Sequence, residues 1–190
     1  MPLTVYTIGH SNHTNEHFFE TLKSRGIEVL VDVRSSPYSR YATWFNRDPL
    51  KTSLGAAGIR YLFLGDSIGG RPERLEFYDD EGYVRYDRLA ASPEFLEGVE
   101  RLLRGAAEYR VVLMCSEEDP TECHRNLLIG RVLADRGVEV IHIRGNGRLD
   151  PASLLARPEA LPLFGKDGGA ELKSTRLVSP RNRQRSSSHS

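Results

Sequence analysis

The chain has 190 residues, 39% of them hydrophobic and 27% charged, which is the composition of an ordinary globular protein with one core. Its 26 Lys and Arg residues balance 26 Asp and Glu residues, so the formal net charge is zero and gives no support for a general polyanion-binding protein. No apolar run approaches the roughly 18 residues needed to span a bilayer, so we expect no membrane partner.

The composition changes toward the C-terminus. We predict an α/β domain over residues 1–165 and a disordered, basic Ser/Arg tail over residues 166–190, where six Lys and Arg residues stand against two acidic residues. The chain has two cysteines, one of them beside an apolar run, and its N-terminus shows no secretory signal. These features favour a reducing, cytoplasmic location over a disulfide-stabilised scaffold.

The first forty residues predict a strand, a helix and a second strand. Residues 3–8 and 29–33 are apolar and partly β-branched, and the helix between them is expected to begin after Thr14 and to stop at Gly26. We predict that the two strands pair in parallel, which places their carboxyl ends at one edge of the sheet. Open α/β sheets bind ligands at that edge.

The residues that follow these strands are therefore candidates for binding a substrate. His10 follows the first strand, and Asp32 and Arg34 stand at the end of the second. Arginine suits phosphate or carboxylate, because the planar guanidinium group matches the oxygen pairs of those anions. Further arginines come from neighbouring segments, and with Arg34 they predict a cationic rim over a cleft: Arg40, Arg47, Arg60, Arg71 and Arg74.

The middle of the chain predicts two helices, one strand and a lid. A short helix begins at Asp48-Pro49, a third strand covers residues 59–63, and a glycine-rich loop follows. Residues 72–91 show no regular period, and their aromatic residues favour an ordered lid or binding loop. Ser92-Pro93 is expected to cap the helix that leads to the next strand.

The most informative stretch is the apolar strand that ends at Cys115, together with the segment after it. A polar loop follows this strand, and Cys123-His124-Arg125 opens a helix that we expect Thr121 to cap. This order places one thiol at the carboxyl end of a strand and the other in the first turn of the helix. Both thiols can therefore face one cleft.

Opposing charges act on a thiol in this position. The positive end of the helix dipole, together with Arg125 and a protonated His124, lowers a thiol pKa. Glu117 and three neighbouring acidic residues raise it by repulsion. The sequence therefore leaves the ionisation of Cys123 open.

A fifth strand over residues 138–143 and a short helix from Asp150-Pro151 complete the predicted domain. The predicted fold is a single three-layer α/β domain, Rossmann-like, with a mostly parallel five-stranded sheet and helices on both faces. In a 3-2-1-4-5 strand order the first and fourth strands are neighbours. His10, Arg34 and Cys115 then converge, and Cys123 lies above them.

Five phrases in order resemble the domain of unknown function 488 family: Thr7-Ile8-Gly9-His10-Ser11; Val31-Asp32-Val33-Arg34-Ser35-Ser36-Pro37 with Ser39-Arg40; Gly65 with Ile68-Gly69-Gly70-Arg71; Cys115-Ser116-Glu117; and Cys123-His124-Arg125. The resemblance runs from about Val5 to about Ile143. It carries no established reaction, but it implies an enzyme-like site that comprises His10, Asp32, Arg34, Arg40, Cys115, Glu117, Cys123, His124 and Arg125.

The leading hypothesis is a cysteine-dependent enzyme, a hydrolase or transferase, that acts on a small anionic substrate such as a nucleotide or a phosphorylated metabolite. Cys123 is the expected nucleophile, and His124 or Glu117 is expected to move protons. The catalytic set is Cys123, His124, Cys115 and Glu117, and the substrate-binding set is His10, Asp32, Arg34, Arg40, Arg71 and Arg125.

Three alternatives stay open. Both cysteines can be small apolar core residues, since free cysteine is often buried. The chain requires no cofactor, yet a metal ion held by Cys115, Cys123, His124 and His10 is a second alternative, with a spacing unlike that of zinc fingers. The third is a non-catalytic nucleic-acid or nucleotide binding module that uses the arginine rim, the tyrosines of the lid and the tail.

Overall fold

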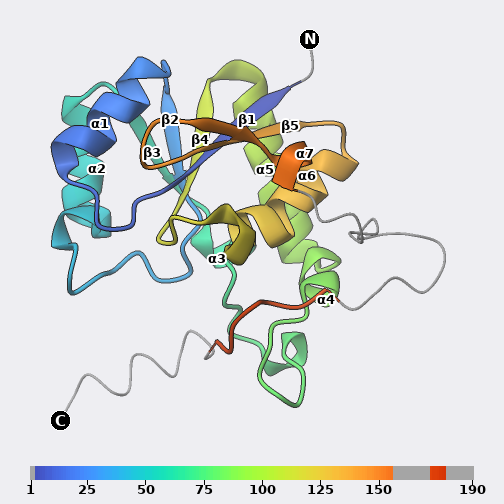
Figure 1. The fold of residues 1–190 in the computed structure, drawn as a ribbon. Coiled ribbons are helices and arrows are strands. Elements are labelled where there is room, and N and C mark those ends of the chain that lie inside the picture. The colour runs from blue at the N-terminus through green and yellow to red at the C-terminus, as the bar shows by residue number, and fades with distance from the viewer. Residues whose placement is uncertain (1–2, 156–171, 179–190) are drawn as a thin grey trace.

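The apolar runs of the sequence form the strands of one sheet in the computed structural model, which describes residues 3–155 and 172–178 (Figure 1). The strands are β1 Thr4–Gly9, β2 Val29–Asp32, β3 Arg60–Phe63, β4 Val111–Cys115, β5 Glu139–Ile143 and β6 Leu149–Pro151. Their order in the sheet is β3-β2-β4-β1-β5-β6. The pairings among β1 to β5 are all parallel, and β6 pairs antiparallel with β5.

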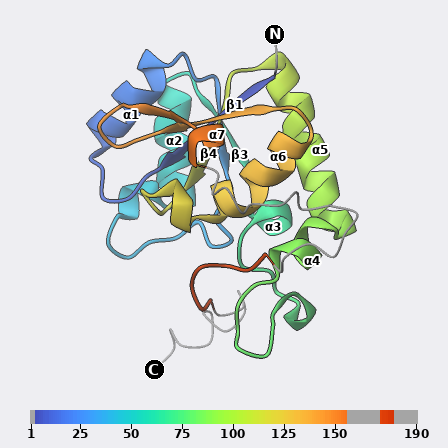
Figure 2. The same ribbon diagram turned by 45° about the vertical axis from the view of Figure 1, so that its right-hand side comes forward.

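Helices cover both faces of the sheet. The helices α1 (Asn15–Ser24) and α2 (Arg47–Ala56) lie on one face, whereas α5 (Pro93–Glu108) and α6 (Arg131–Asp135) lie on the other (Figures 1 and 2). The predicted α/β class, with three layers and a mostly parallel sheet, is therefore confirmed. Shorter segments connect these elements: the 3-10 helices Thr43–Phe45, Leu75–Phe77 and Pro120–Glu122, the α-helices α3 Gly65–Ile68, α4 Tyr86–Ala90 and α7 Ala152–Leu155, and the π-helix Arg125–Gly130.

Each face of the sheet has its own hydrophobic core. On the α1 and α2 side, Phe18 and Leu54 pack in a cluster with Met114 of β4. On the α5 side, Phe95 packs in a cluster with Leu113. The alternation of Leu113 and Met114 between the two clusters is the period of two expected for a strand that is buried on both faces. Within residues 3–155 and 172–178, no helix combines the length and the apolar character needed to cross a membrane.

The predicted helix caps Thr14 and Ser92 are confirmed. The Thr14 and Ser92 hydroxyls each accept a hydrogen bond, at 3.3 Å, from the backbone N–H three residues later. The start of α2 differs from the prediction, because Asn46 occupies the cap position and Asp48 lies inside the first turn.

The sheet has six strands rather than the predicted five. Residues 149–151, where we expected a helix to begin, form β6, and the helix starts directly after them at Ala152. The Arg144 N–H donates to the Arg148 carbonyl at 2.8 Å, and Gly147 has a φ of 80° that favours glycine. The glycine-rich run after β5 is therefore the turn of a hairpin.

The strand order also differs from the predicted 3-2-1-4-5 order. The strands β1 and β2, which we expected to pair with each other, both pair with β4 instead. The expected contact between β1 and β4 is present, and Gly9 lies opposite Cys115 in its register. Because β1, β2 and β4 are parallel, their carboxyl ends still meet at one edge, with Cys115 at the centre.

The predicted lid over residues 72–91 is an ordered excursion from the sheet. Phe77 and Tyr86 are buried, and Tyr78 pairs with Val84 in an isolated antiparallel bridge. The aromatic residues that favoured order in the sequence are thus the residues that attach this excursion to the body.

Residues 172–178 lie beside the excursion and form what we call the strap (Figure 2). The Leu172 carbonyl accepts a hydrogen bond from the Tyr86 N–H at 2.7 Å, and Ser174 exchanges two hydrogen bonds with the Val84 backbone. The strap falls within the tail that we expected to be disordered, but its residues have defined partners. The other residues of that tail lie outside the described part of the chain.

Candidate functional site

Cys115 and Cys123 lie at the carboxyl edge of the sheet, where β4 ends. Both side chains are buried, and both belong to the core cluster on the α5 side. Cys123 is extended, with φ −115° and ψ 140°, and its carbonyl accepts from the N–H groups of Asn126 and Leu127, each at 3.0 Å. Cys123 therefore lies immediately before the helix, and not in its first turn as predicted.

The start of this helix was predicted wrongly because Thr121 does not cap it. The Asp119 carboxylate accepts from the backbone N–H and the hydroxyl of Thr121, at 2.9 and 2.8 Å, and closes the 3-10 turn Pro120–Glu122. The helix begins only after this turn, as the π-helix Arg125–Gly130 that leads into α6. Single-turn π segments are often found at functional sites.

Four side chains meet here, and we call them the thiol cluster: Cys115, Glu117, Cys123 and His124. Glu117 Oε2 lies 2.9 Å from Cys115 Sγ and 3.4 Å from Cys123 Sγ. His124 Nδ1 lies 3.7 Å from Cys115 Sγ and 3.8 Å from Cys123 Sγ. The structure therefore brings the four residues of the catalytic set together, with Glu117 and His124 each next to both sulfurs.

His124 is held in one orientation by its other ring nitrogen. Its Nε2 lies 3.0 Å from the Val33 carbonyl oxygen. A carbonyl only accepts, so Nε2 carries a proton and donates it, and in the neutral ring Nδ1 presents a lone pair to the two sulfurs. Gly70 fits against the same ring, because a Cβ there would lie 2.7 Å from His124 Cγ.

The two thiols have opposite ionisation tendencies. Burial raises the pKa of Cys123, but the hydrogen bond with Cys115 and the positive charges of Arg125 and His124 hold this pKa well below its ordinary value. The hydrogen bond with Cys123, together with burial, raises the pKa of Cys115. Burial lowers the pKa of His124, but the charge of Cys123 outweighs it and raises this pKa overall. The arrangement therefore favours a Cys123 thiolate beside a protonated His124.

Arg125 positions the loop between the cysteines. Its side chain is fully buried, and its guanidinium group donates to the Glu117 carbonyl, to the Glu118 carbonyl at 2.8 Å and to the Thr7 hydroxyl at 3.2 Å. These donors point at protein acceptors, so the predicted substrate-binding role of Arg125 is replaced by a positioning role. Its charge still acts on Cys123.

Arg34 is part of a second buried group next to the thiol cluster. It donates to both carboxylate oxygens of Asp32, at 2.9 and 2.6 Å, and to the Phe45 carbonyl at 2.7 Å. Tyr61 donates to the same carboxylate at 2.8 Å. The predicted substrate-binding roles of Asp32 and Arg34 are not what the contacts favour, since the two side chains satisfy each other in the interior.

His10 belongs to this second group and not to the thiol cluster. Its Nδ1 lies 2.9 Å from the Ser11 carbonyl, and its Nε2 accepts from Arg34 Nη1 at 3.2 Å. Burial and the charge of Arg34 lower the pKa of His10 to about 4, so the ring is neutral at pH 7. Because both ring nitrogens are engaged, His10 is not placed to be the fourth metal ligand considered from the sequence. It touches the cluster only through its backbone N–H, which donates to the Cys115 carbonyl at 2.9 Å.

The predicted arginine rim is not a continuous surface. Arg40 is exposed, in the loop that precedes the 3-10 helix Thr43–Phe45. Three of the other arginines are occupied by neighbours: Arg47 stacks on Phe63, Arg60 stacks on Tyr109, and Arg74 stacks on Phe77 and pairs with Glu76 and Glu94. Arg71, which is one of the predicted substrate-binding residues, lines a cavity.

A family comparison covers this site. The sequence model described as "Domain of unknown function DUF488" matches residues 14–132, which is more than half of the chain. The chain belongs to the DUF488 family. No curated protein and no solved structure matches the chain.

The matched range contains the whole thiol cluster of this DUF488 protein, together with Asp32 and Arg34. The family resemblance seen in the sequence is thereby confirmed, over a shorter range than the one from Val5 to Ile143. The matched range leaves out β5, β1 with Thr7, and His10, which follows β1.

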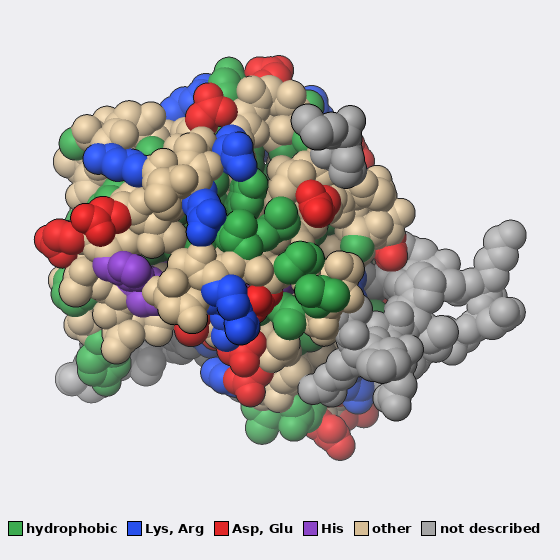
Figure 3. Space-filling view, turned by 45° about the horizontal axis from the view of Figure 1, so that its top comes forward, with side chains coloured by type: hydrophobic (Ala, Val, Ile, Leu, Met, Phe, Trp, Pro, Cys, Tyr) green, Lys and Arg blue, Asp and Glu red, His purple; other side chains and the backbone are tan. Residues whose placement is uncertain are grey.

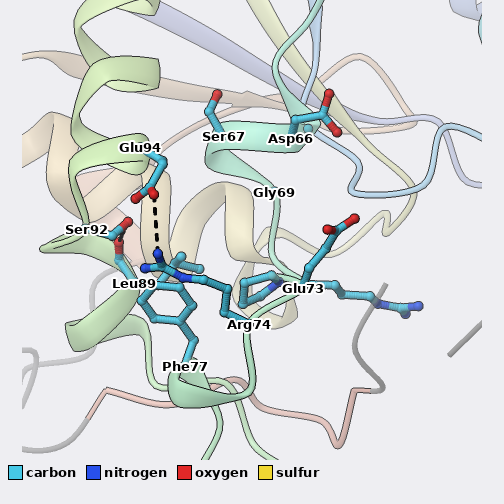
Figure 4. A pocket seen from close by; sticks show the side chains of 12 residues that line it. Asp66, Ser67, Gly69, Glu73, Arg74, Phe77, Leu89, Ser92 and Glu94 are labelled. Atoms are coloured by element: carbon cyan, nitrogen blue, oxygen red, sulfur yellow. Dashed lines mark hydrogen bonds and ion pairs between the residues drawn. The ribbon is translucent and has the colours of Figure 1, made fainter. Parts of the chain in front are cut away.

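A cavity of about 300 Å³ lies between α3, the excursion over residues 72–91 and the start of α5 (Figure 4). Its wall includes Gly69, and the next residue, Gly70, packs on His124. Arg71 and Arg74 bring positive charge to the cavity, and Arg74 is paired there with Glu94 at 3.4 Å. Several lining residues were missed as site residues, because the sequence marks them only as cap, loop or core positions: Ser67, Phe77, Leu89, Ser92 and Glu94.

The thiol cluster also has the composition of a metal site. The ligand atoms of Cys115, Cys123 and His124 all lie within 4.8 Å of one another. The surface gives less support to the nucleic-acid alternative, because basic and acidic side chains are interspersed on the face that Figure 3 shows.

Proposed function

We propose that this DUF488 protein is a cysteine-dependent enzyme, a hydrolase or transferase, in which Cys123 attacks a small anionic substrate. The observation that carries the proposal is the orientation of His124. Its Nε2 is fixed on the Val33 carbonyl, and its Nδ1 faces both sulfurs. A nucleophile, a base and a group that orients the base form the arrangement on which covalent catalysis depends.

The covalent step assigns a role to each member of the cluster. Cys123 Sγ attacks the electrophilic atom of the substrate, a sulfur–substrate bond forms, and the bond to the leaving group breaks. His124 donates its Nδ1 proton to the leaving group, and it then removes a proton from the water or acceptor that cleaves the intermediate and frees Cys123. The Cys115 thiol donates a hydrogen bond to the Cys123 thiolate and stabilises it, and the negative charge of Glu117 helps to raise the pKa of His124.

Arg71 supports an anionic substrate. Its backbone N–H donates to the Ser35 hydroxyl at 2.9 Å, and its side chain lies at the cavity next to Gly69 and Gly70. The charge of Arg71 also reaches the hydroxyl of Tyr86, which is near both sulfurs. A guanidinium group in this position can hold a phosphate or carboxylate between the cavity and Cys123.

Alkylation of the native protein tests the nucleophile. Reduced, chelator-treated protein is exposed to iodoacetamide at pH 7, and each cysteine is quantified by mass spectrometry. We expect Cys123 to react at least about tenfold faster than Cys115, and His124→Gln to slow Cys123 by about tenfold or more. If neither thiol reacts until the protein is denatured, both are core residues instead.

Phosphate protection tests the substrate class in the same assay. Inorganic phosphate is expected to slow the alkylation of Cys123, and Arg71→Ala is expected to abolish this protection. Arg104→Ala is the matched control, since Arg104 is exposed on α5 and should leave the protection intact. Equal protection in all three proteins would remove Arg71 from the proposal.

A further inference from the structure

The thiol cluster contains several atoms that can bind a metal ion, which a cysteine nucleophile alone does not require. Two buried sulfurs and one imidazole nitrogen lie within 4.8 Å of one another, and a carboxylate oxygen of the half-buried Glu117 lies 2.9 and 3.4 Å from the two sulfurs. We infer that Cys115, Glu117, Cys123 and His124 bind one Zn²⁺ ion. This inference uses the residues of the proposed function but does not require that they catalyse a reaction.

The distances fit a tetrahedral ion. Zinc bonds of about 2.3 Å to sulfur and about 2.0–2.2 Å to nitrogen or oxygen, at tetrahedral angles, separate sulfur from nitrogen or oxygen by about 3.5–3.6 Å. The two sulfur–nitrogen distances in the cluster are 3.7 and 3.8 Å, and the Cys123–Glu117 distance is 3.4 Å. The Cys115–Glu117 distance of 2.9 Å is shorter, and a rotation of the Glu117 side chain would open it.

Neighbouring groups orient the ligands before an ion arrives. The Val33 carbonyl holds the His124 ring so that the Nδ1 lone pair points at the sulfurs. Arg125 fixes the backbone carbonyl of Glu117. Hydrogen bonds of this kind to ligand residues set their orientation and strengthen metal binding.

The charges of the site also balance around a divalent cation. Two thiolates and one carboxylate carry three negative charges, and Zn²⁺ with the buried Arg125 guanidinium carries three positive charges. The two sulfurs are otherwise crowded in a place that water hardly reaches, where an ionised group needs a partner. Sulfur and imidazole donors favour Zn²⁺ over Mg²⁺ and Ca²⁺, which prefer oxygen.

Metal binding would control the proposed chemistry. A zinc-bound Cys123 has its reactive lone pair on the metal, so the loaded protein should be alkylated slowly. Removal of the metal exposes the nucleophile. Metal affinity and thiol reactivity are measured separately, so the failure of one proposal does not imply the failure of the other.

The first test is metal binding by the full chain. Reduced, metal-free protein is titrated with ZnCl₂ against a chromophoric chelator, and with CoCl₂ in a spectrophotometer. We expect one Zn²⁺ per chain, and for Co²⁺ the intense d–d bands of a tetrahedral ion together with thiolate-to-metal charge-transfer absorption. A site with less than one ion per chain, or Co²⁺ spectra without thiolate bands, would overturn the inference.

Variants assign the ligands. Cys115→Ser, Cys123→Ser and His124→Gln should each weaken Zn²⁺ binding by at least about a hundredfold, and Glu117→Gln by about tenfold. His10→Gln should retain the wild-type affinity, because the structure gives both nitrogens of His10 other partners. Binding that survives the loss of either cysteine, or that depends on His10, would refute this ligand set.

A measurement on the wild-type chain covers the case in which a variant does not fold. Saturating Zn²⁺ should protect both cysteines from iodoacetamide, and EDTA should restore the reaction. Fast alkylation of Cys123 in the presence of Zn²⁺ would overturn the metal site and leave the nucleophile in place. Slow alkylation after EDTA, together with stoichiometric Zn²⁺ binding, would support the metal site and contradict the nucleophile.

Discussion

His142 shows how a single buried side chain connects the strands to the site. It is fully buried in β5, its Nδ1 lies 2.7 Å from the Thr7 hydroxyl, and its Nε2 lies 3.1 Å from Asn126 Oδ1. Thr7 in turn accepts from Arg125, which positions the loop between the cysteines. A neutral His142 fits this chain of hydrogen bonds, with Nδ1 accepting from the Thr7 hydroxyl and Nε2 donating to Asn126 Oδ1.

The neutral state of His142 predicts a loss of stability in acid. Burial, together with the charges of Arg125 and Arg144, lowers the pKa of His142 from 6.5 to about 4. Between these values the unfolded chain binds the proton and the folded chain does not, so the contribution of His142 is complete above pH 6.5 and is lost as the pH falls toward 4. The free energy of unfolding should fall by up to about 3 kcal/mol for this reason.

Urea denaturation from pH 7 to pH 4.5 measures this effect. His142→Gln should show a shallower loss of stability over this range than the wild type, and His17→Gln, on the exposed side of α1, should follow the wild type. His10 also has a pKa of about 4, but it is present in every protein compared. The difference between the stability profiles of wild type and His142→Gln therefore reports on His142 alone. Parallel profiles for wild type and His142→Gln would contradict the neutral assignment.

At the level of elements, glycines decide how closely the loops approach the thiol cluster. A Cβ at Gly9 would lie 1.9 Å from the Glu117 carbonyl oxygen, and a Cβ at Gly65 would lie 1.9 Å from the Arg34 carbonyl oxygen. The loop after α3 approaches His124 in the same way through Gly70. The glycines quoted for the family resemblance therefore have a steric reason.

Gly70→Ala should displace the His124 ring. The new methyl group would lie 2.7 Å from Cγ and 3.0 Å from Nδ1, so the ring must shift away from the sulfurs. We expect a loss of stability of about 1–3 kcal/mol, together with slower alkylation of Cys123. Gly55→Ala is the matched control, since nothing lies within 4 Å of that position in α2 and alanine favours the helix. Unchanged alkylation in Gly70→Ala would show that His124 does not assist the thiol.

The sequence predicts elements better than it predicts their neighbours. Periodicity and caps are local, and they identify the first five strands, α1 and α5. The insertion of β4 between β1 and β2 depends on a long crossover that no local pattern encodes. The start of the helix after Cys123 was predicted wrongly because Thr121 stands where a helix cap is usually found. In the structure, Thr121 donates its N–H and its hydroxyl to the Asp119 side chain, and these hydrogen bonds close a separate turn.

The same distinction applies to the candidate site. Convergence of the cysteines, Glu117 and His124 follows from a strand, a loop and a helix that are adjacent in the chain. The contacts of Arg34 and Arg125 could not be predicted from the sequence. Their acceptors are backbone carbonyls and a buried carboxylate, which only the fold brings close to them. In the sequence, an arginine that binds a substrate at the end of a strand cannot be told from one that forms hydrogen bonds with a loop.

At the scale of the whole molecule, the strap connects the excursion over residues 72–91 to the turn before Cys123. Ser174 Oγ accepts from the Val84 N–H at 3.0 Å and donates to the Arg176 carbonyl at 2.8 Å. Thr175 Oγ1 donates to the Glu122 carbonyl at 3.3 Å, and Arg176 pairs with the Glu122 carboxylate. Segments from distant parts of the sequence thus meet beside the buried Cys123.

Ser174→Ala should loosen the strap and increase access to Cys123. The substitution removes the acceptor of the Val84 N–H and the donor to the Arg176 carbonyl, while the two backbone hydrogen bonds to Val84 and Tyr86 remain. We expect faster amide hydrogen exchange at Val84, faster alkylation of Cys123 and a change in global stability of no more than about 1–3 kcal/mol. The global core should be little affected, because the strap adds few buried apolar side chains to it.

Hydrogen exchange and alkylation must change together for this interpretation to hold. Ser24→Ala, an exposed position at the end of α1, is the matched control and should change neither rate. Faster exchange at Val84 without faster alkylation would mean that access to Cys123 is controlled elsewhere, for example by Tyr86. If alkylation becomes faster in proportion to a large loss of global stability, the reagent reaches Cys123 through global unfolding. The rate of alkylation through global unfolding depends on the free energy of unfolding, whereas the rate through local opening of the strap does not.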